Sequence, residues 1–274
     1  MVVASDTKVS FSGLSSSQGI IKSQGFHRDW SALIAGNDIS QSLPVVEAAT
    51  ELLRGRSGKA KIVRRGFKRA YAEYRREVMT DALLSSFDMT LAEFNRKGRK
   101  QMNPEIHADI SFQIKNFDLG CTFLVYGFDD DGEPHIFTVS NPGKERVYDK
   151  PGFWAIGAGK TAAISMLAAL GQHPHRNSMH ETIYNVLAAK YISEGASDVG
   201  EETWLFIQKQ GCSAIAHKPN MQEKVRVIWK EKGRPKTNEQ AVEVIKESRI
   251  EFLPVPRGAR ALKRLALRKL KDQQ

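Results

Sequence analysis

Three residues near the start of the chain have the types and spacing that amide chemistry could use. Asp6 ends a short apolar run, Lys22 lies sixteen positions later, and Gly36 lies fourteen positions beyond that. A carboxylate keeps a neighbouring lysine charged and oriented, and the ammonium group then lowers the pKa of a nearby amine or hydroxyl. A glycine lets a substrate or an oxyanion approach a backbone N–H. By themselves, however, an Asp, a Lys and a Gly within one window are better explained by a surface ion pair, because any window of this length offers such residues.

A second candidate is the glycine turn formed by Gly157, Ala158 and Gly159, which Lys160 and Thr161 follow. It looks like the end of a phosphate-binding loop, where glycine amides and a lysine hold phosphates. That motif needs another glycine five residues before Gly159, and Trp154 occupies that position. We therefore interpret the segment as a tight turn from a strand into a helix, and we expect no nucleotide or other cofactor.

Two clusters could suggest a metal. His173, His175 and His180 lie close together with Glu181, and the run 129–131 supplies three aspartates before Gly132. The histidines connect two predicted helices and need not converge on one point. The aspartate run lacks the spaced ligands and terminal Glu of a calcium loop. We expect an interhelical loop and a hairpin turn, and no metal site.

The elements that must position these residues follow from hydrophobic periodicity. Strands are predicted at 2–4, 20–21, 30–35, 110–114, 121–126, 136–139, 153–156, 204–207 and 213–216. Helices are predicted from Ser40 or Ser42 to Leu53, as two segments within 59–97, and at 161–170, 180–193 and 238–247. Short hairpin connections imply antiparallel sheets, and amphipathic helices that come in pairs imply layers outside them. The order of elements therefore predicts an α+β fold.

The spacing of the first three residues takes on meaning from the sequence around them. The run from Val2 to Thr7, then Lys22, then Ala35-Gly36-Asn37-Asp38, resembles the opening of proteasome-type β subunits. The segment from Ala155 to Gly159, followed by Ala162-Ala163, looks like that family's glycine turn from strand to helix. The stretch 188–207 resembles its second paired helix and the strand that follows. The resemblance covers about residues 1–217.

This resemblance implies the N-terminal nucleophile hydrolase fold, a four-layer αββα sandwich of two antiparallel sheets. It implies that Asp6 and Lys22 are catalytic, that the amide of Gly36 lies near the scissile carbonyl, and that Gly157, Ala158 and Gly159 form a turn near the site. It also implies a peptide or amide substrate and a closed ring of like subunits. The family's nucleophile is an N-terminal threonine whose own α-amine serves as the base, a group with a reference pKa of about 7.7–8.0.

The chain departs from the family's pattern at several positions. The nucleophile would precede Asp6 by one strand, about ten residues before Met1, and no residue of the sequence corresponds to it. Ala158 replaces the expected serine of the turn, and Asp198 is the nearest match to an aspartate after the second paired helix. We therefore expect either a threonine-type hydrolase whose first strand is missing from the sequence as written, or an inactive relative; we favour the first, and expect no turnover as written.

The charge of the chain suggests a competing class of function. The formal net charge of the 274 residues is +10, yet segments 54–76 and 257–274 carry local charges of +9 and +6, which leaves −5 for the rest. Basicity therefore belongs to two segments rather than to the whole fold. The alternative is a non-catalytic protein that uses 54–76 and the basic tail at 257–271 to bind nucleic acid, an anionic surface or a partner subunit.

Composition sets the remaining expectations. A hydrophobic fraction of 41% supports a real core, and no run approaches the length of a membrane span. Two cysteines cannot form a disulfide scaffold, which favours a reducing, cytoplasmic setting. We expect one hydrolase-like domain over 1–235 with a basic helical insert at about 54–100, followed by a C-terminal helix and basic tail over 236–274.

Overall fold

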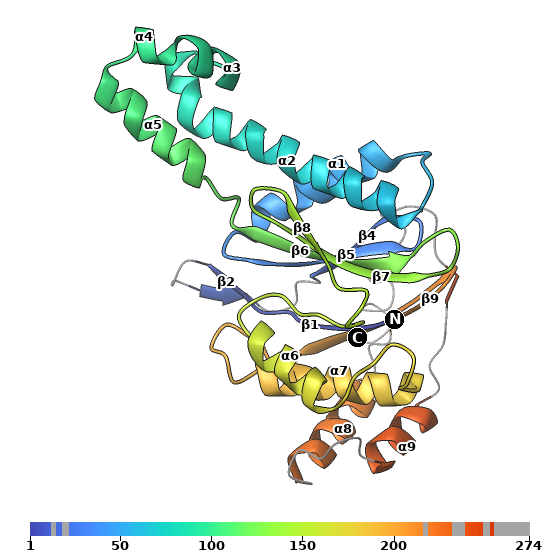
Figure 1. Ribbon diagram of the computed structural model, residues 1–274. Helices are drawn as coiled ribbons and strands as arrows, with labels where there is room; N and C mark the ends of the chain where they lie inside the picture. Colours follow the sequence, from blue (N-terminus) through green and yellow to red (C-terminus); the bar gives the residue numbers. More distant parts are fainter. Residues whose placement is uncertain (12–14, 18–21, 216–218, 232–238, 249–252, 255–274) are drawn as a thin grey trace, which may run out of the picture.

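A computed structural model describes residues 1–11, 15–17, 22–215, 219–231, 239–248 and 253–254. Within these residues the chain forms two antiparallel sheets packed face to face, with helices outside both (Figure 1). This arrangement confirms the predicted αββα sandwich. A separate two-stranded ribbon, β2 (Val9–Phe11) with β3 (Ser15–Ser17), stands apart from both sheets.

The first sheet has the order β4-β5-β6-β7-β8. Its strands are Ser23–His27, Trp30–Gly36, Cys121–Phe128, Pro134–Ser140 and Lys144–Val147. Helices α1 (Ser42–Leu53) and α2 (Ala60–Leu84) cover one face of it. The interface between them contains seventeen buried apolar side chains, in which Phe67 makes edge-on contacts with Phe26 and Phe123. Such dense packing fixes the positions of the strands.

The second sheet has the order β1-β9-β10-β11. Its strands are Val2–Asp6, Thr203–Lys209, Cys212–Ile215 and Leu253–Pro254. Helices α6 (Lys160–Ala169) and α7 (Met179–Ser193) lie on its outer face, and α8 (Pro219–Glu231) and α9 (Glu239–Glu247) pack beyond α7. Among the described residues β1 pairs only with β9, so its other edge carries no strand.

The layer between the two sheets is different from the outer layers. Its cluster has three buried side chains, Leu33, Leu124 and Tyr126, with partly buried neighbours that include Val3 and Trp154. The rest of this layer is a cleft of about 1670 Å³. The interior of the sandwich therefore contains a space that side chains of the described residues leave open.

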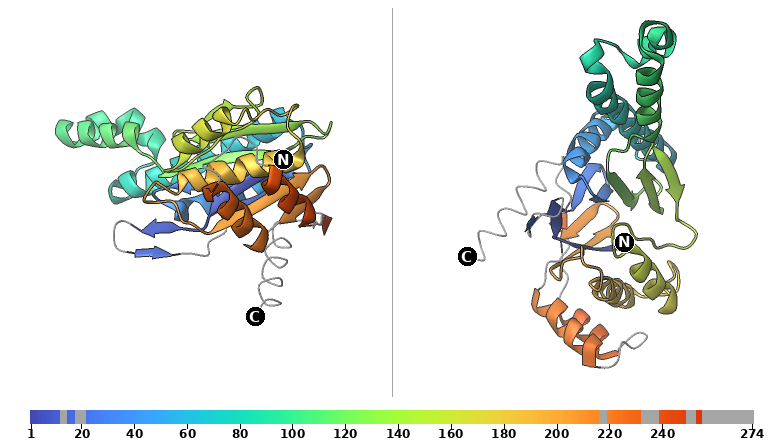
Figure 2. Two further views of the ribbon diagram at one scale, coloured as in Figure 1. Left: turned by 90° about the horizontal axis from the view of Figure 1, so that it is seen from below. Right: turned by 90° about the vertical axis from the view of Figure 1, so that its left-hand side faces the viewer.

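A helical arm extends from the outer end of α2, away from the sandwich (Figures 1 and 2). It contains short turns at Ser85–Phe87, Leu91–Glu93, Phe94–Gly98 and Arg99–Gln101, and returns through α5 (Pro104–Asn116). The prediction of a strand at 110–114 is therefore wrong. Asn103 caps α5 and Pro104 occupies its first turn, which is a helix start signal that the apparent alternation of Ile110, Phe112 and Ile114 concealed.

Three further predictions need correction. Residues 153–156 form no strand, because this extended segment lies at the cleft without a partner strand among the described residues. No strand was predicted between 20–21 and 30–35, yet β4 covers Ser23–His27 and a two-residue turn joins it to β5. Gln41, rather than Ser40 or Ser42, precedes α1, and Asp38 caps the turn before it. The predicted strand at 20–21 and the basic tail at 257–271 lie outside the described residues.

The other predicted elements are present with small shifts of their ends. The 59–97 region contains α2 and then a new start at Thr90, whose side chain forms a capping box with Glu93. Thr80, by contrast, lies inside α2 and bonds to the carbonyl of Arg76. Helix α8 and strand β8 were not anticipated, because the first is an amphipathic segment without a clear cap and the second is polar and exposed.

Candidate active site

Asp6 and Lys22, which the sequence singled out, are in direct contact. Lys22 Nζ lies 2.8 Å from Asp6 Oδ1, and the two side chains are only 14% and 16% exposed. Asp6 stands at the end of β1 and also accepts a bond from the backbone N–H of Lys8. The carbonyl of Lys22 accepts a bond from Ile34 N, which anchors that residue beside β5. The ion pair therefore connects the ends of the two sheets.

Gly36 lies at the end of β5, where the chain has no room for a side chain. A Cβ at this position would lie 2.0 Å from the carbonyl oxygen of Gly120. That oxygen already accepts bonds from the N–H groups of Asn37 and Asp38. Close approach of two backbones is thus the local reason for a glycine here.

The glycine turn at 157–159 faces the same region. A Cβ on Gly157, whose φ is +90°, would touch Ala35 Cβ at 3.4 Å, and a Cβ on Gly159 would lie 2.6 Å from Ser193 Cβ. The turn is therefore wedged between the end of β5 and the end of α7. Helix α6 starts directly after it, at Lys160. All three residues of the turn line the cleft together with Asp6, Lys22 and Gly36.

A buried ionic network holds the loop between α7 and β9 against this site. Glu194 binds both Lys190 Nζ, at 2.6 Å, and the guanidinium of Arg226 from α8. Lys190 also donates to the carbonyl of Gly200 at 2.7 Å, and Arg226 donates to the carbonyl of Glu201 at 2.8 Å. Two cations thus share one carboxylate while each fixes a carbonyl of the loop. We call Lys190, Glu194 and Arg226 the loop clamp.

Electrostatics within the loop clamp follow from burial. Burial lowers the pKa of Lys190, and the adjacent Glu194 carboxylate opposes this change. The bonds from Glu194 instead raise the pKa of Arg226. Lys190 lines the cleft and lies close enough to Asp6 for that carboxylate to act on its charge. Asp6 therefore lies near two lysines: it contacts Lys22 directly and interacts with the charge of Lys190.

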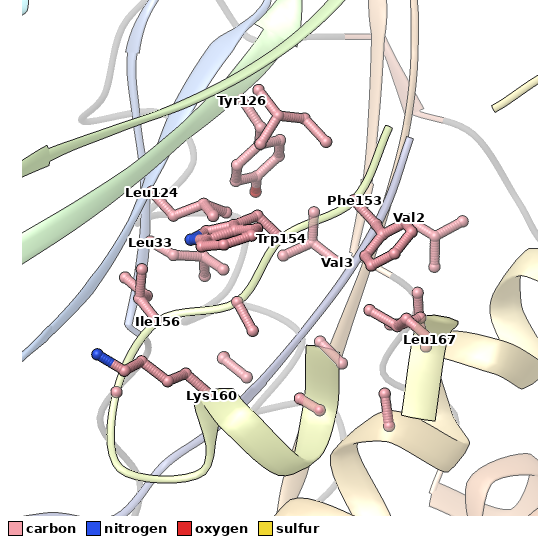
Figure 3. A pocket seen from close by; sticks show the side chains of 18 of the residues that line it. Val2, Val3, Leu33, Leu124, Tyr126, Phe153, Trp154, Ile156, Lys160 and Leu167 are labelled. Carbon is pink, nitrogen blue, oxygen red and sulfur yellow. The ribbon is translucent and has the colours of Figure 1, made fainter. Parts of the chain in front are cut away.

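The apolar wall of the cleft is centred on one tryptophan. Figure 3 shows Trp154 between the side chains of Leu33 and Leu124 and that of Val3. Its ring stacks on Tyr148 at 3.7 Å between centroids. The cleft therefore presents an apolar surface beside the open edge of β1 and polar groups where that strand ends. Such a surface suits an extended peptide with an apolar side chain.

The other candidates from the sequence do not join this site as ligands. The rings of His173 and His175 lie 5.8 Å apart, and Glu181 bonds to Ser178 in the capping box that starts α7. Asp130 in the 129–131 run binds Ser57 and Gly58 N, so it ties the hairpin to the start of α2. In the described part of the chain no three His, Cys, Asp or Glu side chains gather in a way that could hold a metal ion.

The loop clamp was not predicted from the sequence. One signal was available, since Lys190 and Glu194 have the i, i+4 spacing of an ion pair on one helix face. Arg226 could not have been assigned, because it reaches Glu194 from a helix 32 positions later in the chain. The position of Asp198, which the family resemblance left uncertain, is now clear in one respect: it lines the same cleft as Asp6.

The fold and the site together point to a known class, and comparison with known proteins defines it. The family model described as "Proteasome subunit" matches residues 60–200, more than half of the chain. The chain belongs to the proteasome subunit family. The match includes the glycine turn and Lys190 but begins after Gly36.

Among solved structures the chain is similar to an Anbu (Gly-1) mutant from Hyphomicrobium sp. strain MC1. The TM-score is 0.59 and the identity 15%, over 93% of this chain and 94% of that one. At this identity the likeness shows the shared fold alone, a proteasome-like N-terminal nucleophile hydrolase fold. A search of the curated proteins finds no match. No helix among the described residues is long and apolar enough to cross a membrane.

Proposed function

We propose that this chain is a proteasome-like subunit of the threonine-type peptidase or amidohydrolase class. The observation that supports the proposal most strongly is the buried contact between Asp6 and Lys22 at 2.8 Å, at one end of a cleft that Gly36 and the 157–159 turn also line. Family membership makes this chemistry the expected one. The proposal assigns the nucleophile to none of the 274 residues.

Each site residue has a role in this proposal. Asp6 holds the Lys22 ammonium in place, and the ammonium lowers the pKa of the attacking hydroxyl or of the α-amine that accepts its proton. The backbone beside Gly36 and the 157–159 turn supplies N–H groups for the substrate or for the oxyanion that forms on its carbonyl. The substrate is a peptide or amide whose extended backbone lies along the cleft. No cofactor or metal takes part.

The proposal includes a setting for the subunit. Subunits assemble into a closed homo-oligomeric ring, as the family resemblance implies. The protein works in the cytoplasm, where its two free cysteines, Cys121 and Cys212, stay reduced. Residues 1–235 form the hydrolase-like unit with its helical insert at about 54–100, and 236–274 form the C-terminal helix and tail.

The alternative, a non-catalytic protein that binds through its basic segments, receives less support. In segment 54–76, Arg54, Arg64 and Arg69 form ion pairs within the described chain. Arg75 donates to the carbonyls of Ile114 and Phe117, so its charge serves the fold. The tail at 257–271 lies outside the described residues, and its role as a binding segment for nucleic acid, an anionic surface or a partner stays a prediction.

The decisive experiment adds an N-terminal threonine to the chain. A strand of about ten residues that begins with threonine is placed before Met1, and the chain as written is prepared in parallel. Both are treated with an electrophile selective for N-terminal threonine and with a fluorogenic peptide amide. We expect covalent labelling and amine release from the extended chain and neither from the chain as written.

Two variants of the extended chain sharpen this test. Lys22→Ala should reduce amine release by about a hundredfold or more, because the ammonium acts on the proton transfer. Lys144→Ala removes a lysine from exposed β8 and should leave the rate unchanged. Turnover by the chain as written, or an extended chain that stays folded yet is neither labelled nor active, would contradict the proposal.

A further inference from the structure

The helical arm carries a disproportionate share of the exposed apolar surface. Six large apolar side chains are exposed among the described residues, and three of them lie on the arm: Phe87 at 41%, Ile106 at 46% and Phe112 at 67%. The arm has its own small core of Leu84, Phe94 and Ile110. Phe87, Ile106 and Phe112 are therefore not needed for the packing that holds the arm together.

Phe112 lies on the outer face of α5. Ile110, on the other side of the helix, is buried in the arm's core, and Phe112 points away from that core. Helical periodicity places Glu105 and Asp109 beside Phe112, at seven and three positions before it. Both acids are exposed. The outer face of α5 thus presents an exposed aromatic ring with two carboxylates in the turns before it.

The tip of the arm has the opposite charge. Arg96, Lys97, Arg99 and Lys100 follow one another within five positions, and all four are exposed. None of the four forms an ion pair with another described residue. This contrasts with the basic residues nearer the sandwich, such as Arg64, which pairs with Glu145. The tip is therefore a cluster of four cations that form no ion pair in the described chain, although Glu93 lies close enough to interact with the charges of Lys97 and Arg96.

We propose that the arm is a self-complementary interface through which two copies of this chain associate. The arms pair antiparallel, so that the basic tip of one copy lies on the outer face of α5 of the other. An isologous contact of this kind requires a surface that carries both halves of the match, and the arm carries both. Arginine over an aromatic face, flanked by carboxylates, combines a cation–π contact with ion pairing.

The composition of the arm favours a protein partner over nucleic acid. Exposed aromatic residues and arginine are enriched where proteins meet. Phosphate binding would use the basic tip alone and would leave Phe112 uncovered, with Glu105 and Asp109 repelling the backbone of the nucleic acid. The arm also extends beyond the sandwich (Figure 2), so a second copy can reach it from the side away from the sheets. The association is independent of the proposed active site.

Charge reversal and its compensation test this interface. The tip variant Arg99→Glu/Lys100→Glu and the face variant Glu105→Lys/Asp109→Lys are compared with the unchanged chain by sedimentation equilibrium at low and high salt. Each variant alone should weaken arm-dependent association by about tenfold or more, because like charges then meet across the contact. An equimolar mixture of the two variants should recover association, because complementary charges face each other in both halves of each mixed pair. The chain that carries all four substitutions should recover the original association.

A matched control reverses two charges elsewhere. Arg65→Glu/Lys68→Glu changes exposed residues of α2 nearer the sandwich and should leave association unchanged. Circular dichroism establishes that every variant keeps its helices. The proposal is overturned if the unchanged chain shows no association that responds to the tip variant, if the control weakens it equally, or if the fourfold variant fails to recover it. Retention of DNA that only the tip variant abolishes, without any change in self-association, would assign the tip to nucleic acid instead.

Discussion

The two interior layers of this molecule are filled very differently. Between the five-stranded sheet and α1 and α2, seventeen apolar side chains are buried, with aromatic rings packed edge to face. Between the two sheets, the described residues form a buried apolar cluster of only three side chains, and a cleft of about 1670 Å³ remains. The outer layer holds the strands in place, while the inner layer leaves space between them.

This difference explains how the candidate site can be both rigid and open. Asp6 and Gly36 stand at the ends of β1 and β5; β1 is paired along its length with β9, and β5 is paired on both sides, with β4 and β6. The loop clamp also holds its segment in place, because its charged groups bond to carbonyls of the α7–β9 loop. A site built on such supports needs little rearrangement when a ligand enters. Substitutions in the packed outer layer should therefore destabilise the protein more than substitutions at the open inner layer.

The first prediction compares one aromatic residue from each layer. Phe67→Ala should lower the free energy of unfolding by about 3–5 kcal/mol, because Phe67 is fully buried and its removal leaves a cavity. Trp154→Ala should cost about 1–2 kcal/mol, because its ring faces the existing cleft and loses chiefly the stacking on Tyr148. Urea denaturation followed by circular dichroism measures both. Equal losses would show that the inner layer is as tightly packed as the outer one.

The second prediction concerns the loop clamp. Glu194→Gln should lower the free energy of unfolding by about 3 kcal/mol, because Lys190 and Arg226 then stay buried without the carboxylate that they share. Glu51→Gln is the control, since its partner Arg54 is 73% exposed, and a change below about 0.5 kcal/mol is expected there. Chemical denaturation of both variants decides the matter. If the free energy of unfolding falls no more for Glu194→Gln than for Glu51→Gln, the loop clamp does not stabilise the site.

The third prediction concerns the close backbone contact at the site. Gly36→Ala should cost about 2–3 kcal/mol, because the new Cβ would meet the Gly120 carbonyl at 2.0 Å and β5 must shift from β6. Gly55→Ala meets nothing within 4 Å, although its φ is +70°, and should cost about 1 kcal/mol from the left-handed backbone alone. Because Gly36 also has a positive φ, of +154°, both variants carry a backbone penalty, and the difference between them in thermal unfolding reports the clash at Gly36. A smaller loss of stability for Gly36→Ala than for Gly55→Ala would mean that β5 can move away from β6 at little cost.

The sequence predicts features that depend on neighbouring residues better than features that depend on contacts between distant parts of the chain. Asp6, Lys22 and Gly36 could be proposed because family resemblance relates positions that periodicity cannot connect. The strand at 110–114 was predicted wrongly because Ile110, Phe112 and Ile114 alternate, although only Ile110 is fully buried and Asn103-Pro104 starts a helix. The cleft and the contact of Arg226 with Glu194 could not be predicted, because they depend on how distant elements pack.

The fourth prediction concerns His135, which lies where the two layers meet. Its ring stacks on Trp30 of the packed layer, and its Nδ1 lies 2.8 Å from Asp149, which lines the cleft. Bonding to Asp149, with Asp129 in support, raises the pKa of His135 although burial opposes this. The folded state therefore holds this proton more tightly than the unfolded chain does. The resulting stability is fully present below the unfolded pKa of about 6.5 and is lost as the pH rises through the higher folded value.

His135→Gln keeps a hydrogen-bonding side chain but removes the titration. Its stability deficit relative to the unchanged chain should be about 1–2 kcal/mol at low pH, the worth of a charge-assisted bond, and should shrink as the pH rises through the folded pKa. The free energy of unfolding is measured in urea at a series of pH values for both chains. Burial lowers the pKa of His27, which has the opposite pH dependence, but this contribution is common to both chains and cancels in the difference. A deficit that grows with pH would show that His135 is neutral in the folded protein, and that the connection between the packed layer and the cleft does not depend on its charge.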